Sequence, residues 1–155
     1  MHLNQHTDYG LRVLLYLAAC PEGAAPSPDI SSAYDISLHH LRKVVQNLAR
    51  AGYIQTMRGR TGGLTLARPA DQIHLGQVVR DLEPDFDLVE CFNPRDNTCV
   101  ISPACILHGA LEEAQRAFLD VLDRYTLAEL ARNRTYLWRI LGPRVVPRGA
   151  AVPLN

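Results

Sequence analysis

Three of the four cysteines, Cys91, Cys99 and Cys105, lie close together in the 155-residue sequence. Seven residues separate the first pair and five the second, and most of them are polar residues or proline. No regular helix or strand is therefore expected between the thiols. Thiolate is the preferred terminal ligand of iron in iron-sulfur clusters. The spacing predicts a loop that supplies three strong cluster ligands and leaves a fourth position to a weaker one.

Other cysteine chemistries are compatible with the same residues. Structural zinc sites favour paired thiols about two to four residues apart, unlike the gaps found here. Thiol-based redox sensing needs no metal. Disulfides are disfavoured, because residues 1–10 do not resemble a signal peptide and we expect a reducing cytoplasmic location. Cys20 ends an apolar segment and is predicted to pack as a small hydrophobic residue.

Length and charge narrow the class of protein. The chain suffices for about one domain, and no apolar run approaches the ~20 residues of a membrane span, so we expect a soluble protein. The net charge is zero, but residues 1–70 hold seven basic and four acidic residues, whereas residues 71–155 hold nine and twelve. Residues 35–68 contain six basic residues and one acid. This excess predicts a surface for nucleic-acid phosphates.

The segments before the cysteines predict a DNA-binding fold. Thr7 is expected to cap a helix that ends at Ala19. Ser27 and Ser37 are expected to cap two further helices, over 28–34 and 38–51, joined as a helix-turn-helix. Strands over 53–56 and 64–67 would flank a glycine-rich hairpin tip. This order predicts a mainly α (α+β) winged helix-turn-helix domain.

The remaining segments predict a dimerisation region. A strand is expected over 73–75 and a helix over 76–82. Ser102-Pro103 would open a long helix that carries Cys105 in its first turn and ends near Asp123, and Thr126 and Glu129 would form the capping box of a last helix. The long helix has an apolar stripe that favours an isologous dimer: Leu107, Ala110, Leu111, Ala114, Phe118, Val121 and Leu122. We divide the chain into a DNA-binding region (1–84), a cluster loop (85–102), dimerisation helices (103–141) and a disordered tail (142–155).

Five sequence segments together carry a family pattern. They are Thr7-Asp8-Tyr9-Gly10-Leu11-Arg12, Arg58-Gly59-x-x-Gly62-Gly63, Val78-Val79-Arg80-x-Leu82-Glu83-Pro84, Ser102-Pro103-Ala104-Cys105 and Asp123-x-Tyr125-Thr126-Leu127-Ala128-x-Leu130. In this order they resemble a known family, the winged-helix iron-sulfur transcriptional repressors, and most closely their NsrR-type, nitric-oxide-sensing branch. The resemblance covers about residues 1–141, although the gap between Cys91 and Cys99 is longer than the family pattern.

The resemblance implies a set of cluster ligands. Cys91, Cys99 and Cys105 would bind a [4Fe-4S] cluster, and Asp8 matches a position that supplies an oxygen ligand from the other subunit. His108 matches the position of a histidine ligand to a [2Fe-2S] cluster in IscR-type members, so it is the alternative fourth ligand. A weakly held oxygen ligand would leave one iron open to a small diatomic molecule.

The resemblance also implies a mechanism and partners. A homodimer would occupy palindromic double-stranded operator DNA as a repressor and leave it when nitric oxide reacts with the cluster. The alternative is an IscR-like [2Fe-2S] regulator of iron-sulfur or redox homeostasis. We expect the DNA contacts to come from the helix predicted over 38–51, with its cap, and from the hairpin tip. The residues are Ser37, His39, His40, Lys43, Gln46, Arg58, Gly59 and Arg60.

Two further classes of function fit the residues less well. A metal-free winged-helix adaptor for proteins would not need the basic stretch, and an enzyme is disfavoured. The glycine-rich segment lacks the lysine of a phosphate-binding P-loop, and no nucleophile and base are suitably spaced.

Overall fold

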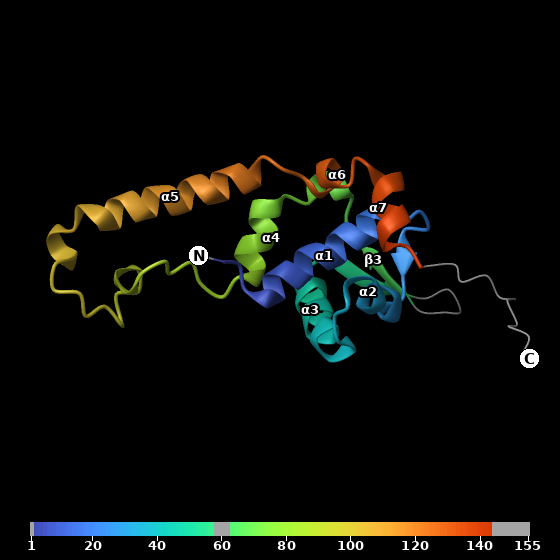
Figure 1. The fold of residues 1–155 in the computed structure, drawn as a ribbon, viewed down its shortest axis with the longest axis horizontal. Coiled ribbons are helices and arrows are strands. Elements are labelled where there is room, and N and C mark those ends of the chain that lie inside the picture. The colour runs from blue at the N-terminus through green and yellow to red at the C-terminus, as the bar shows by residue number, and fades with distance from the viewer. Residues whose placement is uncertain (1, 58–62, 144–155) are drawn as a thin grey trace, which may run out of the picture.

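The computed structural model describes residues 2–57 and 63–143, and most of them are helical. Figure 1 shows a body from which one long helix, α5, projects as an arm, with the cysteine-bearing loop returning beside it. The helices are α1 (Gln5–Ala19), α2 (Ser27–Tyr34), α3 (Leu38–Arg50), α4 (Leu75–Leu82), α5 (Ile106–Asp123), α6 (Leu127–Leu130) and α7 (Arg134–Leu141). The strands are β1 (Ala24–Ala25), β2 (Ile54–Met57) and β3 (Gly63–Leu66). Within the described residues, no helix has both the length and the apolar character that a membrane crossing requires.

Helix α1 forms the centre of the body. The prediction that Thr7 caps it was wrong: the side chain of Asn4 accepts the Thr7 N–H at 2.8 Å, and Thr7 is buried in the first turn. The predicted end at Ala19 is confirmed. There, the guanidinium of Arg134, at the start of α7, donates to the Ala19 carbonyl at 3.0 Å. The helix end is therefore held by a residue far along the chain.

The helix-turn-helix is confirmed as α2 and α3. Asp35 takes a left-handed conformation (φ 53°) between them, which its short polar side chain tolerates. Ser37 caps α3 as predicted by accepting the His40 N–H at 3.3 Å. The apolar residues of α3 recur at helical spacing and face inward: Leu41, Val44 and Leu48 are buried and Val45 is half-buried. The prediction that Ser27 caps α2 was wrong: the helix begins at Ser27 itself, and Pro26, which has no side-chain acceptor, is its N-cap residue.

A three-stranded antiparallel sheet of order β1-β3-β2 completes the winged-helix architecture. Strands β2 and β3 lie within one residue of the predicted ranges. Strand β1 was not predicted, because two alanines carry no alternation that a pattern could reveal. A Cβ on Gly63 would meet the Ala25 carbonyl oxygen at 2.6 Å, so glycine permits this close approach of β3 to β1.

Helix α4 is tied to three other elements. The prediction of a strand over 73–75 was wrong: a 3-10 turn ends at Gln72, and His74 makes only an isolated bridge with Thr126. The predicted helix is confirmed, beginning at Leu75. Its polar side chains make these contacts: the Tyr53 hydroxyl donates to Asp81 at 2.5 Å, both terminal nitrogens of Arg80 donate to Asp123 at 2.7 Å, and Glu83 accepts the Asn4 N–H at 3.1 Å.

The Tyr53–Asp81 bond gives a stability prediction. Tyr53 is buried, and burial followed by the hydrogen bond to Asp81 raises the pKa of its hydroxyl. Replacing Tyr53 by phenylalanine is expected to lower the free energy of unfolding by about 1–2 kcal/mol, because the bond to a carboxylate is lost. Urea denaturation measures the change. Tyr125→Phe is the matched control, since Tyr125 is 47 % exposed, and an equal loss there would contradict the assignment.

Helix α5 starts at Ile106, one residue after Cys105. A 3-10 turn covers Ser102–Ala104, and Cys105 is extended (φ −82°, ψ 108°) as the N-cap of α5. The prediction that Cys105 lies in the first helical turn was therefore wrong. The predicted capping box of Thr126 and Glu129 is confirmed and starts α6. Helix α7 follows, and its Trp138 packs edge-to-face on Tyr16 of α1, with ring centroids 5.4 Å apart.

The Arg80–Asp123 pair joins α4 to the base of the arm. The bond from Arg80 holds the pKa of the Asp123 carboxyl below its ordinary value. We expect Arg80→Gln to raise this pKa, measured by NMR titration of the carboxyl carbon. Because the folded pKa is the depressed one, the pair contributes stability above the unfolded pKa of about 3.9 and loses it as the pH falls through the folded pKa. The effect on stability is expected to be small, since both side chains are over a third exposed. An unchanged Asp123 titration would contradict the contact.

Candidate functional site

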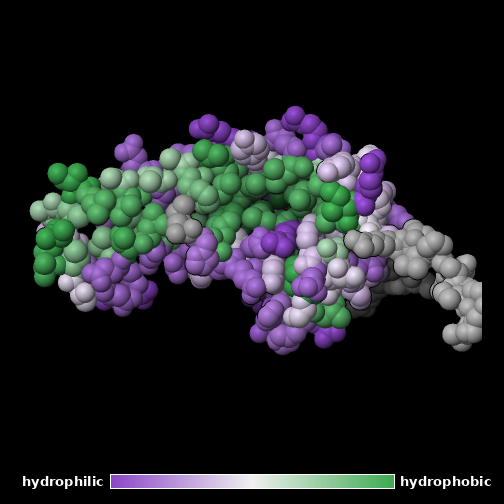
Figure 2. Space-filling model, in the orientation of Figure 1, coloured by the Kyte–Doolittle hydropathy of each residue, from purple (hydrophilic) through white to green (hydrophobic). Residues whose placement is uncertain are grey.

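The arm presents an apolar face to solvent. None of the residues of α5 is buried in the single chain. Ile106 is 90 % and Leu107 63 % exposed, and Val100 and Ile101 in the adjoining loop are exposed as well. Figure 2 shows the apolar residues as a continuous band along the arm and onto the body. An amphipathic helix that exposes its apolar stripe is typical of a protein interface.

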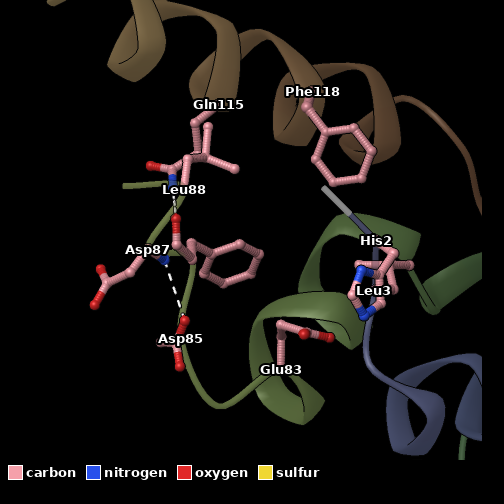
Figure 3. A pocket seen from close by; sticks show the side chains of 9 residues that line it. His2, Leu3, Glu83, Asp85, Asp87, Leu88, Gln115 and Phe118 are labelled. Atoms are coloured by element: carbon pink, nitrogen blue, oxygen red, sulfur yellow. Dashed lines mark hydrogen bonds between the residues drawn. The ribbon is translucent and has the colours of Figure 1, made fainter. Parts of the chain in front are cut away.

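A pocket lies where the chain leaves α4 and passes along α5. Its volume is about 470 Å³. Phe118 and Gln115 project into it from α5, and Glu83 borders it at the end of α4, as Figure 3 shows. The Gln115 amide donates to the Phe86 carbonyl, which holds the segment before the cysteines against the arm. The pocket is lined by His2, Leu3, Glu83, Asp85, Phe86, Asp87, Leu88, Gln115 and Phe118.

All three clustered cysteines are half-buried free thiols, and Cys20 is a buried one. The confirmed irregular loop holds Cys91 in a 3-10 turn and Cys105 at the start of α5. The Cys91 sulfur lies 3.3 Å from Nδ1 of His108. The His108 ring packs edge-to-face against Phe92 at a centroid distance of 5.1 Å, which fixes its orientation.

The donor set fits an iron-sulfur cluster in its chemistry, because three accessible thiols and a neighbouring imidazole are ligands that iron accepts. The described part of the single chain holds no group of three or more histidine, cysteine, aspartate or glutamate side chains close enough to bind a metal ion. The structure thus brings His108 to a predicted cysteine ligand. It does not gather all three cysteines.

Asp8, the predicted oxygen ligand, lies in the first turn of α1. Its carboxylate pairs with Arg12 at 2.8 Å, and both side chains are 43 % exposed. The guanidinium of Arg12 also lies within 6 Å of the rings of Tyr9 and Tyr34. Within one chain, Asp8 is therefore held by a cation of its own helix. The carboxylate is nevertheless accessible on the surface of the body.

The predicted DNA contacts on α3 are solvent-exposed. These are Ser37, His39, His40, Lys43 and Gln46. Arg42, which we had not included, is exposed on the same helix, and its spacing of three and four from His39 and Gln46 could have revealed it. The predicted hairpin residues Arg58, Gly59 and Arg60 lie outside the described residues, as does the predicted tail beyond Pro143.

The winged body, the cysteine loop and the exposed arm can be compared with known proteins. The model of the Rrf2 family, described as an iron-dependent transcriptional regulator, matches residues 3–133. The chain belongs to the Rrf2 family. As a transcriptional regulator of this family it is not an enzyme, which confirms the sequence-based expectation.

The Rrf2 regulator has similar curated relatives of nearly equal length. The HTH-type transcriptional regulator NsrR of Geobacillus kaustophilus is 48 % identical over 145 residues, covering 93 % of this chain and 99 % of that protein. The regulator of the same name from Bacillus subtilis is 46 % identical over 142 residues, covering 91 % and 97 %. The predicted resemblance to the NsrR-type branch is thereby confirmed.

Solved structures confirm the winged-helix fold of this Rrf2 protein. The global cysteine regulator CymR of B. subtilis superposes with a TM-score of 0.69 at 27 % identity, covering 86 % of this chain and 98 % of that one. IscR of T. potens gives a TM-score of 0.69 at 24 % identity, covering 86 % and 88 %. At 24 % identity, the likeness to IscR concerns the fold alone.

Proposed function

We propose that this Rrf2 protein is a nitric-oxide-responsive iron-sulfur repressor that binds palindromic operator DNA as a homodimer. The observation that carries the proposal is the placement of three free, half-buried thiols in an irregular loop at the start of an exposed apolar helix. Such a loop joins a metal-binding donor set to an interface between subunits. The strong similarity to regulators named NsrR supports the same conclusion.

Each part of the chain has a role in this proposal. Residues 1–84 bind DNA, residues 85–102 with Cys105 hold a [4Fe-4S] cluster, and residues 103–141 supply the dimer contacts. Asp8 of the other subunit, released from Arg12, is the fourth ligand. When bound, the cluster would supply an iron with a displaceable ligand at which nitric oxide reacts, and that reaction would end repression.

The protein's own residues link the loop to the DNA-binding body. The loop begins directly after α4, whose Asp81 is bonded to the buried Tyr53 of the winged domain. Glu83, the last residue before Pro84, accepts the N–H of Asn4, which caps α1. A change in the loop therefore acts on α4 and, through these bonds, on the helices that carry the DNA contacts.

A second candidate is an IscR-like [2Fe-2S] regulator of iron-sulfur or redox homeostasis. The 3.3 Å contact between the Cys91 sulfur and His108 favours it, because it places an imidazole beside a predicted ligand. His108 would then replace Asp8 as the fourth ligand.

Anaerobic purification followed by absorption and native mass spectrometry tests both candidates. Nitric oxide is titrated in while operator binding is followed. A [4Fe-4S] mass that is lost together with operator binding supports the proposal. A [2Fe-2S] mass indifferent to nitric oxide favours the second candidate, and a colourless zinc-bound or metal-free protein removes both.

A further inference from the structure

The first turns of α1 and the exposed side of α3 form a small cleft. Its volume is about 100 Å³, well below the roughly 300 Å³ and more of pockets that hold organic ligands. Figure 1 shows α3 lying under α1 in the body. The cleft is lined by Gln5, His6, Tyr9, His40, Lys43 and Val44.

The lining suits a small anion. Among these six residues of the described structure there is one lysine, two imidazoles, an amide and a phenol, and no side chain is acidic. The nearest acidic residue in sequence, Asp8, is already paired with Arg12 at 2.8 Å. Lysine, imidazole, amide and phenol groups are all donors to phosphate oxygens.

A contact between α1 and α3 fixes one side of the cleft. The Asn47 amide nitrogen lies 3.0 Å from Nε2 of His6. Because an amide nitrogen only donates, Nε2 accepts in this contact, and the neutral ring carries its proton on Nδ1. His6 is therefore positioned by α3 and retains one N–H donor.

The same contact divides the residues of α3 into two sides. His40, Lys43 and Asn47 follow at spacings of three and four, so they share the side that faces α1. His39, Arg42 and Gln46 share the adjacent side, which is exposed and borders no part of the cleft. Only one side of a helix in the major groove faces the base edges, whereas its flanks approach the backbones.

We propose that the cleft between α1 and α3 binds a backbone phosphate of the operator through Lys43, His40 and His6. This proposal rests on the proposed DNA-binding function and deepens it. His40 and Lys43, expected from sequence to read bases, are reassigned to the phosphate backbone. His39, Arg42 and Gln46 are left as the base-reading side. His6 and Gln5 join the DNA interface from α1.

Binding to two duplexes separates a phosphate contact from a base contact. The first duplex is one that the parent protein, purified anaerobically, enriches from a random-sequence pool; the second is a scrambled duplex of the same composition. Fluorescence anisotropy over a salt series is measured for Lys43→Gln, His6→Gln and Gln5→Ala. Gln46→Ala is the comparator for base reading, and His2→Gln is the matched control because His2 is exposed outside the cleft.

Lys43→Gln is expected to weaken the binding of both duplexes by the same factor. It is also expected to reduce the slope of log K against log salt concentration by about 2 for a dimer, since each phosphate contact contributes about 0.9. His6→Gln is expected to weaken binding of both duplexes by about a hundredfold, because a hydrogen bond to a charged group, worth about tenfold, is lost in each of the two subunits. Gln5→Ala, an exposed change that leaves the buried face of α1 intact, is expected to weaken both by the same factor. Gln46→Ala is expected to weaken binding of the enriched duplex only. His2→Gln is expected to leave the affinity for both duplexes unchanged.

Selective loss of the enriched duplex in Lys43→Gln would overturn the proposal, as would unchanged binding in both His6→Gln and Gln5→Ala. A parent protein that enriches no sequence contradicts the repressor function. The cleft is then still tested on the scrambled duplex, where equal weakening supports it and unchanged binding overturns it.

Discussion

Replacing Cys99 by alanine is expected to remove the iron-sulfur absorption of the protein and its response to nitric oxide. Cys99 is a half-buried free thiol in the loop between the 3-10 turn at Cys91 and the start of α5. Removing one of three thiolate ligands is expected to lower the iron content by more than about tenfold, since even loss of an outer-shell partner commonly costs that much. Iron per subunit and native mass measure the change.

Cys20→Ala is the matched control for this prediction. Cys20 is 2 % exposed, and its thiol donates to the Ala24 carbonyl at 3.3 Å, outside the cysteine loop. This variant is expected to keep the cluster absorption. Retention of iron in Cys99→Ala together with loss in Cys20→Ala would contradict the assignment of the ligands.

The fourth ligand is tested in the same way. If Asp8 is the ligand, Asp8→Ala lowers cluster content or changes its spectrum while His108→Ala does not. The reverse outcome supports the IscR-like alternative. Arg12→Gln is a useful companion, because it frees the Asp8 carboxylate from its 2.8 Å ion pair without removing it.

Placing arginine on the apolar face of α5 is expected to turn the protein into a monomer. Leu107 is 63 % exposed and Ala114 is exposed, so Leu107→Arg and Ala114→Arg break no packing of the single chain. In a dimer each would bury an unpaired charge. Operator affinity is expected to fall by about a hundredfold or more, because the two half-sites are no longer bound together. Analytical ultracentrifugation and operator titration measure the two effects.

Glu113→Arg provides the control for the dimer prediction. Glu113 is exposed and is not one of the residues of the apolar stripe, so the same side chain is introduced outside that stripe. It is expected to leave the mass in solution unchanged. A dimer that persists in both Leu107→Arg and Ala114→Arg would place the subunit interface elsewhere.

Capping residues and helical spacing, which are visible in short stretches of sequence, predicted the elements that depend on contacts between neighbouring residues. The Ser37 cap and the capping box at Thr126 each arise within four residues, and the buried stripe of α3 arises within a single helix. The last helix was predicted without its division into α6 and α7, although Asn133, whose side chain accepts the Tyr136 N–H, is a typical N-cap residue and gave a local signal for the start of α7. Thr7 resembled a cap as well as Asn4 does, and only the burial of Thr7 in the folded body distinguishes them.

The site was predictable in its residue types but not in its contacts. The cysteine spacing selects the ligands, whereas the Cys91–His108 contact joins residues 17 apart through the course of an irregular loop. Which side of α3 faces α1 depends on where the two helices cross. The sequence of α3 alone does not give that position. Arg80 and Asp123 are 43 residues apart and meet only because α4 and α5 pack together.

The arm has a mechanical consequence. Its eighteen residues form a rod about 27 Å long at 1.5 Å per residue. The rod is fastened at its C-terminal end by the Arg80–Asp123 pair and the His74–Thr126 bridge, while the cysteines lie at its opposite end. A sideways force at the cysteine end thus acts about the packing of α5 against α4 with nearly the full length of the helix as its lever arm. Displacements of an ångström or two at the thiols then correspond to a rotation of only a few degrees where α5 meets α4, so a small movement of the cysteine loop is transmitted to the body as a small change of angle.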